Sequence, residues 1–364
     1  MDTLAISLLQ RETAYPSVSL LLPVDGDGVE QVKLRLRHLV DQAVDRLRHE
    51  LDADAVAAFA DRLSAGVDRV EMLAGQQGVA VYVSDLTTIV PLSVRVRERV
   101  VVDDTFATRD LVRAFQRSPR YWVVTLGPKL TRLFEGVGFD LSEVHGGGFP
   151  LNGTSSRVGT AARSAGRGRV SRDGRRDGPG TTSIDKSVRE LDDALSVYLQ
   201  EGSLPLVLVG TEPRLAAVAR STRHRHKIAA TVRGATDFPV LADLRLRVWP
   251  VIESMLREET AEAVAELERA GGAARHISGV AETWTLANQG RGDLLLVEEG
   301  FEYPARIDPT NGQVTGTADR DQPGVVDDLV DEIIEVVLAK RGRCHIVPDA
   351  SLARYDRIAM KLRY

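Results

Sequence analysis

Residues 120–136, RYWVVTLGPKLTRLFEG, hold the pattern from which the architecture of this chain is predicted. The run RYWVVTLG is short and apolar, Gly127–Pro128 is a turn signal, and LTRLFEG continues after it, so we expect two strands joined by a turn. Further along come a helical segment (SIDKSVRELDDALSVYLQEG), an apolar strand (LPLVLVG), a second helix (TEPRLAAVARST) and another strand (KIAATVRG). The order strand, loop, helix, strand, helix, strand predicts an α/β domain.

The segment before it predicts a smaller α/β domain that ends near Ser118–Pro119. SVSLLLP, residues 17–23, is a short apolar run followed by the turn signal DGDG, which indicates a strand. Two amphipathic helices follow, because apolar residues recur at three- and four-residue spacing. The residues expected on their buried faces are Val32, Leu36, Leu39, Val40, Ala43, Leu47, Val56, Phe59, Leu63, Val67 and Val70. GVAVYVS, TTIVPLSVRV and RVVVD then predict the strands that carry this helix pair.

The last part of the chain alternates helical and strand patterns. Residues 238–270 are helical, with a kink or a junction between two helices expected at Pro250. We then expect a helix (AARHISGVAETWTLANQG), a strand (DLLLVEE), a hairpin-like insert, a helix (PGVVDDLVDEIIEVVLAKRG) and two strands (RCHIVPD and RIAMKLRY). The sequence therefore predicts a mixed α/β (α+β) fold in three consecutive α/β domains, residues 1–118, 119–250 and 251–364, the last an α/β sandwich.

The charge is unevenly distributed along the chain. The formal net charge is −5, but residues 118–250 carry 20 Lys and Arg against 13 Asp and Glu, a net charge of +7, which leaves −12 for the rest. Such asymmetry indicates a module that meets a polyanion, flanked by acidic segments. The alternative is a solvated surface with one basic loop.

The most basic stretch is GTAARSAGRGRVSRDGRRDGPG, residues 159–180. It has few apolar side chains to bury, so we expect a mobile basic loop over residues 154–183. Guanidinium groups bind phosphates in bidentate fashion and glycines let the chain approach closely, so the loop is predicted to bind RNA. The residues are Arg163, Arg167, Arg169, Arg172, Arg175 and Arg176. A plain linker has the same composition and remains the alternative.

A second basic cluster, RSTRHRHK, occupies residues 220–227, at a predicted corner between a helix and a strand. We expect Arg220, Arg223, Arg225 and Lys227 to contact RNA. A solvated turn is the alternative. His224 and His226 make a poor metal site without a third ligand.

Motifs of other classes are absent from the sequence. Cys344 is the only cysteine, so no internal disulfide can form, and its position on a strand beside His345 favours a core thiol over a dyad. There is no Walker A loop, no G-x-S-x-G elbow and no Cys/His set with zinc spacing. We therefore expect no cofactor and no metal. A basic leader and an apolar run of about 20 residues are also missing, so we expect a cytoplasmic protein without membrane contact.

Six segments together resemble a known family: PSVSLLLP, GVAVYVS, RYWVVTLGPKLTRLFEG, PLVLVGTEPRLAAV, GVAETWTLANQGRGDLLLVEEG and GRCHIVPDASLARYDRIAMKLRY. Their succession is similar to the bacterial branch of the archaeo-eukaryotic release factor and Pelota superfamily. The resemblance implies a three-domain translation factor that enters the ribosomal A site. It implies a middle domain that reaches the peptidyl-transferase centre with a mobile loop, and a C-terminal domain like the kink-turn-binding ribosomal-protein fold that contacts a translational GTPase such as elongation factor Tu.

The resemblance also locates a missing motif. Residues 145–183 lie where release factors carry a catalytic Gly-Gly-Gln loop, yet no glutamine occurs between Gln116 and Gln200. Peptide release needs that residue to position water, so we expect none, and whether the chain is an enzyme stays open. The sequence favours a non-catalytic, Balon-like hibernation or stalled-ribosome factor that binds ribosomal RNA and also transfer RNA. The alternatives are a peptidyl-tRNA hydrolase or RNA-cleaving enzyme with a rebuilt loop, and an interaction protein that has lost the ribosome.

Overall fold

The computed structural model describes residues 6, 8–10, 12–72, 76–152, 181–199, 204–234, 241–271, 275–320, 322 and 324–364. Helices and sheets are mixed throughout, so the predicted mixed α/β class is confirmed. The chain forms two compact units: Met1–Arg117 together with Leu256–Tyr364, called unit 1, and Ser118–Met255, called unit 2. The three predicted domains remain a prediction. No helix of the described ranges is long and apolar enough to cross a membrane.

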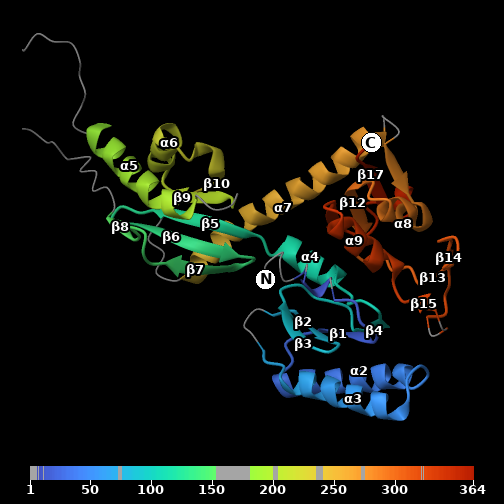
Figure 1. Ribbon diagram of the computed structural model, residues 1–364. Coiled ribbons are helices and arrows are strands. Elements are labelled where there is room, and N and C mark those ends of the chain that lie inside the picture. The colour runs from blue at the N-terminus through green and yellow to red at the C-terminus, as the bar shows by residue number, and fades with distance from the viewer. Residues whose placement is uncertain are drawn as a thin grey trace, which may run out of the picture. The chain divides into compact units, whose positions relative to one another are not determined.

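The N-terminal part of unit 1 is an antiparallel sheet in the order β3-β2-β1-β4, with a helix pair beside it (Figure 1). The strands are β1 (Ser17–Pro23), β2 (Gly78–Val83), β3 (Thr87–Leu92) and β4 (Arg99–Asp103), and the helices are α2 (Val29–Leu47) and α3 (Ala53–Asp68). Alternate residues of a strand point to opposite faces. Leu20 and Leu22 accordingly pack with the helix pair, whereas Leu21 joins a second apolar cluster. The predicted helix faces are buried, which confirms the periodicity.

Helix α4 (Arg109–Arg117) was missed by the sequence analysis. Its buried face includes Arg109, Asp110 and Arg113, so no apolar stripe marks it in the sequence. The carboxylates that pair with these arginines lie both within α4 and some 190 to 220 residues further along the chain. The helix therefore depends on long-range ion pairs that local periodicity cannot reveal.

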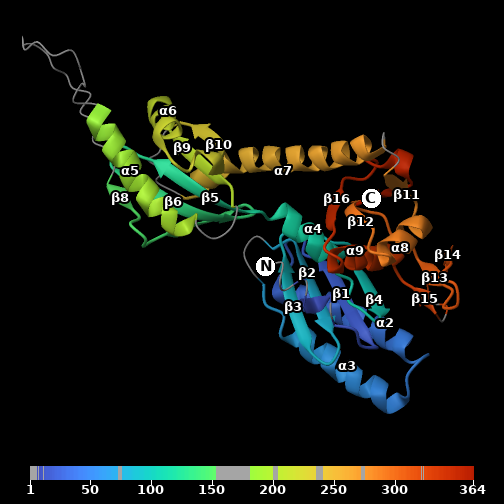
Figure 2. The ribbon, with the colours of Figure 1, turned by 45° about the horizontal axis from the view of Figure 1, so that its top comes forward.

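The C-terminal part of unit 1 has a sheet in the order β11-β17-β12-β16 (Figure 2). Its strands are β11 (His276–Ser278), β12 (Gly292–Glu298), β16 (Arg343–Val347) and β17 (Ile358–Leu362), and its helices are α8 (Val280–Asn288) and α9 (Leu329–Ala339). A small sheet in the order β14-β13-β15 comprises β13 (Ala305–Ile307), β14 (Val314–Gly316) and β15 (Val325–Val326), and a 3-10 turn η2 spans Ala353–Tyr355.

The expected helix over residues 273–290 is partly wrong, because it begins with strand β11. Gly279, with φ of 84°, separates the strand from α8. Glycine readily adopts a positive φ, which ends a strand or a helix. The strand was not predicted because three residues are too few to show an alternating apolar pattern.

Unit 2 has a mixed sheet in the order β10-β9-β5-β6-β7, with β8 paired to β6 (Figure 1). The strands are β5 (Arg120–Leu126), β6 (Leu130–Val137), β7 (Asp140–Val144), β8 (Leu151–Asn152), β9 (Leu206–Gly210) and β10 (Ile228–Arg233). Strands β5, β9 and β10 are parallel, whereas β5, β6 and β7 are antiparallel, which confirms the strand-turn-strand prediction for residues 120–136. Across the β5–β6 pair, a Cβ on Gly136 would lie 2.4 Å from the ring of Tyr121, so only glycine fits there.

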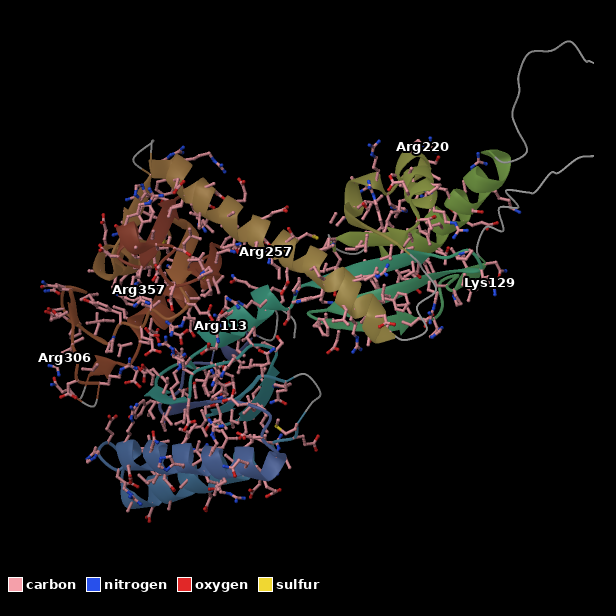
Figure 3. The ribbon with its side chains drawn as sticks, turned by 180° about the vertical axis from the view of Figure 1, so that it is seen from behind. Arg113, Lys129, Arg220, Arg257, Arg306 and Arg357 are labelled. Atoms are coloured by element: carbon pink, nitrogen blue, oxygen red, sulfur yellow. The ribbon has the colours of Figure 1, made fainter. Side chains whose placement is uncertain are left out.

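Helices α5 (Thr181–Tyr198) and α6 (Glu212–Ser221) cover one face of this sheet. The first turns of α7 (Leu241–Gly271) lie on the other face, as the views from front and behind agree (Figures 1 and 3). Trp122 and Val124 pack under α5 and α6. Helix α7 continues through Pro250, so the junction between two separate helices expected there is wrong.

Candidate nucleic-acid interface

The six arginines of the basic loop, Arg163, Arg167, Arg169, Arg172, Arg175 and Arg176, lie outside the described residues. Their contact with RNA stays a prediction. The structure does describe where the chain reaches this segment, because Asn152 at the end of β8 pairs with Leu130 at the start of β6. After the segment the chain resumes at Thr181, the first residue of α5.

The turn HGGGFP, residues 145–150, fixes the approach to β8. The backbone N–H of Gly146 donates to the carbonyl of Phe149 at 3.0 Å, and the reverse hydrogen bond measures 2.9 Å. A Cβ on Gly147, which has φ of 54°, would lie 2.7 Å from the hydroxyl of Tyr198 on α5. Phe149 is buried in the core beneath α5, so the turn is anchored immediately before the basic loop.

The second basic cluster, residues 220–227, forms the corner between α6 and β10, as predicted. We call it the basic corner. Arg220 lies in the last turn of α6, and a 3-10 turn η1 (Arg225–Lys227) leads into β10. Arg220, Arg223 and Arg225 are exposed and Lys227 is half-buried. Figure 3 shows Arg220 at α6. The structure thus brings these four cations together on one short segment.

Asp192 on α5 holds the backbone of the basic corner. This carboxylate is 5 % exposed, accepts from the Thr222 hydroxyl at 2.5 Å and accepts from the backbone N–H of Arg223 at 3.0 Å. The Thr222 hydroxyl oxygen in turn accepts from the backbone N–H of His224 at 3.0 Å. Ser196 lies 3.1 Å from Nε2 of the same histidine. The corner is therefore held by neighbouring elements before any ligand arrives.

The role of Asp192 escaped the sequence analysis, although a signal was present. Val188, Leu191 and Leu195 form the buried stripe of α5, and a position four residues after Val188 falls on the same stripe. A carboxylate there must find hydrogen-bond donors when buried. Its partners lie about 30 residues away, so only the fold reveals them.

The guanidinium groups of unit 2 differ in how strongly they are held. Arg132 makes a two-point contact with Glu143. The hydrogen bond from Arg132 lowers the pKa of the Glu143 carboxyl below its usual range, although burial acts in the opposite direction. Arg223 pairs with the exposed Asp193 at 2.9 Å and with the Ser196 hydroxyl at 2.7 Å. Exposed pairs of this kind are weak and can exchange for phosphate.

Lys129 is a further candidate that the sequence analysis did not single out. It is exposed in the β5–β6 turn, next to Leu130, the residue that pairs with Asn152. Figure 3 shows it on the same unit as Arg220. The sequence could have indicated this exposed lysine, because Lys129 directly follows the turn residues Gly127 and Pro128.

Cys344 agrees with its interpretation as a structural group. Cys344 is buried and free, and burial raises the pKa of its thiol to about 12, as for a core thiol. Among the described residues, no three His, Cys, Asp or Glu side chains gather as a metal site would require.

These features define a multidomain mixed α/β protein whose middle segment carries a preformed basic corner. Residues 120–291 match the bacterial archaeo-eukaryotic release factor family 3. This match covers just under half of the chain.

Solved structures resemble the chain at low identity. They include the archaeal translation termination factor aRF1 (16% identity, TM-score 0.25, covering 99% of this chain and 96% of that one). Pelota from Archaeoglobus fulgidus gives 13% identity and a TM-score of 0.35, covering 79% of each chain. Dom34 from S. cerevisiae, a translation termination-like factor, gives 10% identity and a TM-score of 0.38, covering 82% of this chain and 77% of that one. No curated protein matches the chain.

Proposed function

We propose that the protein is a ribosome-binding, translation-factor-like protein that occupies the A site, as a non-catalytic hibernation or stalled-ribosome factor. The observation that carries the proposal is the basic corner, which lies inside the segment that matches a release factor family. Release factors act on the ribosome, whose surface is a dense array of RNA phosphates.

The geometry of the corner suits phosphate binding. Arg220, Arg223 and Arg225 project from a short exposed segment whose backbone is held by Asp192, so little ordering entropy remains to be lost on binding. Their positive charge supports contact with ribosomal RNA and with transfer RNA through the phosphate backbone.

A non-catalytic role is supported by the composition of the loop region. A release factor needs a glutamine there, and residues 117–199 contain none. In the described part of this region, the HGGGFP turn is packed against Tyr198 on α5. We therefore expect purified protein to release labelled peptide from programmed ribosomes at the background rate. A rate well above background would instead favour the peptidyl-tRNA hydrolase alternative.

The partners follow from the same proposal. The protein would work in the cytoplasm, and its C-terminal segment would contact a translational GTPase such as elongation factor Tu. Capture of that GTPase by full-length protein on ribosomes would support this contact, and its absence would contradict it.

Ribosome binding is tested by sedimentation through sucrose gradients from growing and from starved cells. The test variant replaces Arg220, Arg223, Arg225 and Lys227 with Gln. The matched control replaces four exposed arginines of the C-terminal segment, Arg257, Arg269, Arg341 and Arg354, with Gln. We expect the wild type and the control to sediment with ribosomes, most strongly in starved cells. Equal sedimentation of both variants would contradict the proposal.

A further inference from the structure

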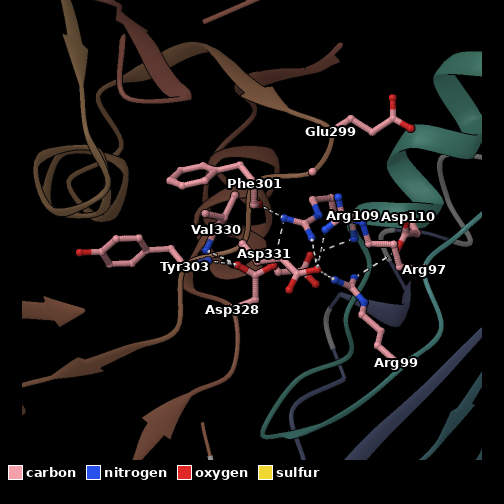
Figure 4. Close-up of polar contacts among 12 residues, drawn as sticks. Arg97, Arg99, Arg109, Asp110, Glu299, Phe301, Tyr303, Asp328, Val330 and Asp331 are labelled. Carbon is pink, nitrogen blue, oxygen red and sulfur yellow. Dashed lines mark hydrogen bonds and ion pairs between the residues drawn. The ribbon is translucent and has the colours of Figure 1, made fainter. Parts of the chain in front are cut away.

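Unit 1 contains a cavity of about 280 Å³ that the proposed function does not use. Five arginines line it: Arg95, Arg97, Arg99, Arg109 and Arg113. They come from the segment before and within α4, and the opposite wall comes from the C-terminal segment at Glu299–Glu302 and at Asp349. Figure 4 shows part of the lining of the cavity, with Arg97, Arg99 and Arg109 grouped together.

Three of these arginines form a rigid inner frame. Arg99 lies 3.0 Å from Asp110 and 3.0 Å from Glu302. Arg109 lies 3.0 Å from Asp328 and donates to the carbonyl of Phe301. Buried ion pairs of this kind hold side chains in one geometry.

Arg113 completes the frame. Its guanidinium pairs with Asp110 at 3.0 Å and also with Glu299. The Nε atoms of Arg99 and Arg113 nevertheless have no hydrogen-bond acceptor in the described residues. The carboxylates of the frame therefore do not satisfy all the donors of these arginines.

The other two arginines lie more in solvent. The Arg97 side chain is 66% exposed, and its ion pair is a long one of 4.0 Å, to an oxygen of Glu302 that Arg99 already contacts at 3.0 Å. Arg95 is 68% exposed and pairs with Asp25. Arg97 is thus the guanidinium of the cavity with the greatest spare donor capacity.

Gly300 places Arg97 at the cavity. A Cβ on Gly300 would lie 2.6 Å from Nη2 of Arg97, so the guanidinium lies directly against the main chain there. The backbone N–H of Gly300 donates to Asp349 at 2.8 Å, which fixes this loop. The absence of a side chain at Gly300 therefore leaves room for the Arg97 guanidinium beside the cavity.

We propose that this cavity binds a small phosphate-bearing anion, about the size of pyrophosphate, through Arg97 together with the inner arginine frame. The lining holds five guanidinium groups against four carboxylates, and guanidinium forks match phosphate oxygens. The volume is at the lower limit for ligand pockets, which suits a compact anion better than a large ligand. The anion would connect residues 95–113 with residues 299–349 within unit 1, and this site is independent of ribosome binding.

The test is isothermal titration of the full-length protein with inorganic pyrophosphate, inorganic phosphate and GDP at low ionic strength. The basic loop also offers arginines to anions, so the assay includes a variant with its six arginines replaced by Ser. We expect saturable binding at one site that survives the loop change, and a rise in melting temperature with ligand concentration. Equal affinity for GDP and pyrophosphate would assign recognition to the phosphates alone, whereas tighter binding of GDP would contradict a site for a compact anion.

The deciding variant is Arg97→Gln, whose long ion pair makes it unimportant for the fold. We expect at least tenfold weaker binding and an unchanged melting temperature without ligand. The matched control is Arg37→Gln, which removes the same charge from an exposed pair with Asp68 elsewhere in unit 1 and should bind like wild type. Absence of saturable binding, or equal affinity in the Arg97 and Arg37 variants, would overturn the proposal.

Discussion

Arg109 in unit 1 and Arg223 in unit 2 lie in opposite environments. In unit 1, Arg109 is 5% exposed and its partner Asp328 is equally buried, so charge is neutralised inside the protein. In unit 2, Arg223 is 55% exposed and pairs with an exposed aspartate. A count of charges along the sequence does not separate these cases. The comparison shows that burial and partner, rather than residue type, decide whether a cation stabilises the fold or remains available to a ligand.

The largest effect is expected from breaking a buried pair. Arg109→Ala leaves Asp328 buried without its guanidinium partner, and removing one partner of a buried pair costs about 3–5 kcal/mol. We expect that loss in urea unfolding, together with faster hydrogen exchange in peptides from α9. A loss below about 1 kcal/mol would show that the two regions do not differ as described.

The basic corner is tested through the residue that holds it. Asp192→Ala leaves the Thr222 hydroxyl and the Arg223 N–H without their acceptor, which should cost about 1–3 kcal/mol. Ribosome affinity should fall even though the net charge becomes more positive. The control is Asp193→Ala, which removes an exposed carboxylate from the same helix. Stronger or unchanged binding by the Asp192 variant would mean that charge alone governs the interface.

A third test uses the pH dependence of stability, because unit 1 buries carboxyl groups. Burial raises the pKa of Asp103 to about 7, and burial, followed by the charges of Asp331 and Glu332, raises the pKa of Glu335 well above its usual range. Raised values mean that the folded state holds protons more tightly than the unfolded state. This stabilisation is complete below the unfolded pKa of about 4 and is lost as pH rises through the folded values.

Unit 1 should therefore lose stability between pH 5 and pH 9, by about 1.4 kcal/mol for each pH unit over which one of these groups is protonated in the folded state only. Glu335→Gln keeps an acceptor for the Thr108 hydroxyl and removes one titrating group, so it should flatten the profile. The measurement is urea unfolding at several pH values. A stability that rises with pH in this range would contradict the assignment.

The smallest effect is expected from an exposed cation of unit 2. Arg223→Ala should change the stability by less than about 1 kcal/mol. In ribosome binding at increasing salt, loss of one phosphate contact should flatten the log–log slope by roughly 0.7 to 0.9. An unchanged slope would remove Arg223 from the interface.

Local sequence patterns were sufficient to predict much of the fold, but they predicted few of the contacts between segments that are distant in the sequence. The strand-turn-strand of residues 120–136 and the stripes of α2 and α3 follow from periodicity, because each is set by near neighbours. Helix α4 could not be predicted in this way, because its buried face is charged and most of the carboxylates that pair with its arginines lie in the other end of the chain. The basic corner was located from the sequence, but the hydrogen bonds that Asp192 accepts from it join positions about 30 residues apart.

The division of unit 1 between the two ends of the chain has a consequence for synthesis. Tyr82, Phe106 and Leu111 from the first end share one apolar cluster with Leu295 and Ile333 from the other. At roughly 5–20 residues per second, the first end leaves the ribosome some tens of seconds before its partner strands exist. Unit 2 is complete in the nascent chain during that interval, so its core can form first. The apolar face of β1 and β2 stays exposed until the C-terminal end has been synthesised, so a chaperone that shields nascent chains would bind this face.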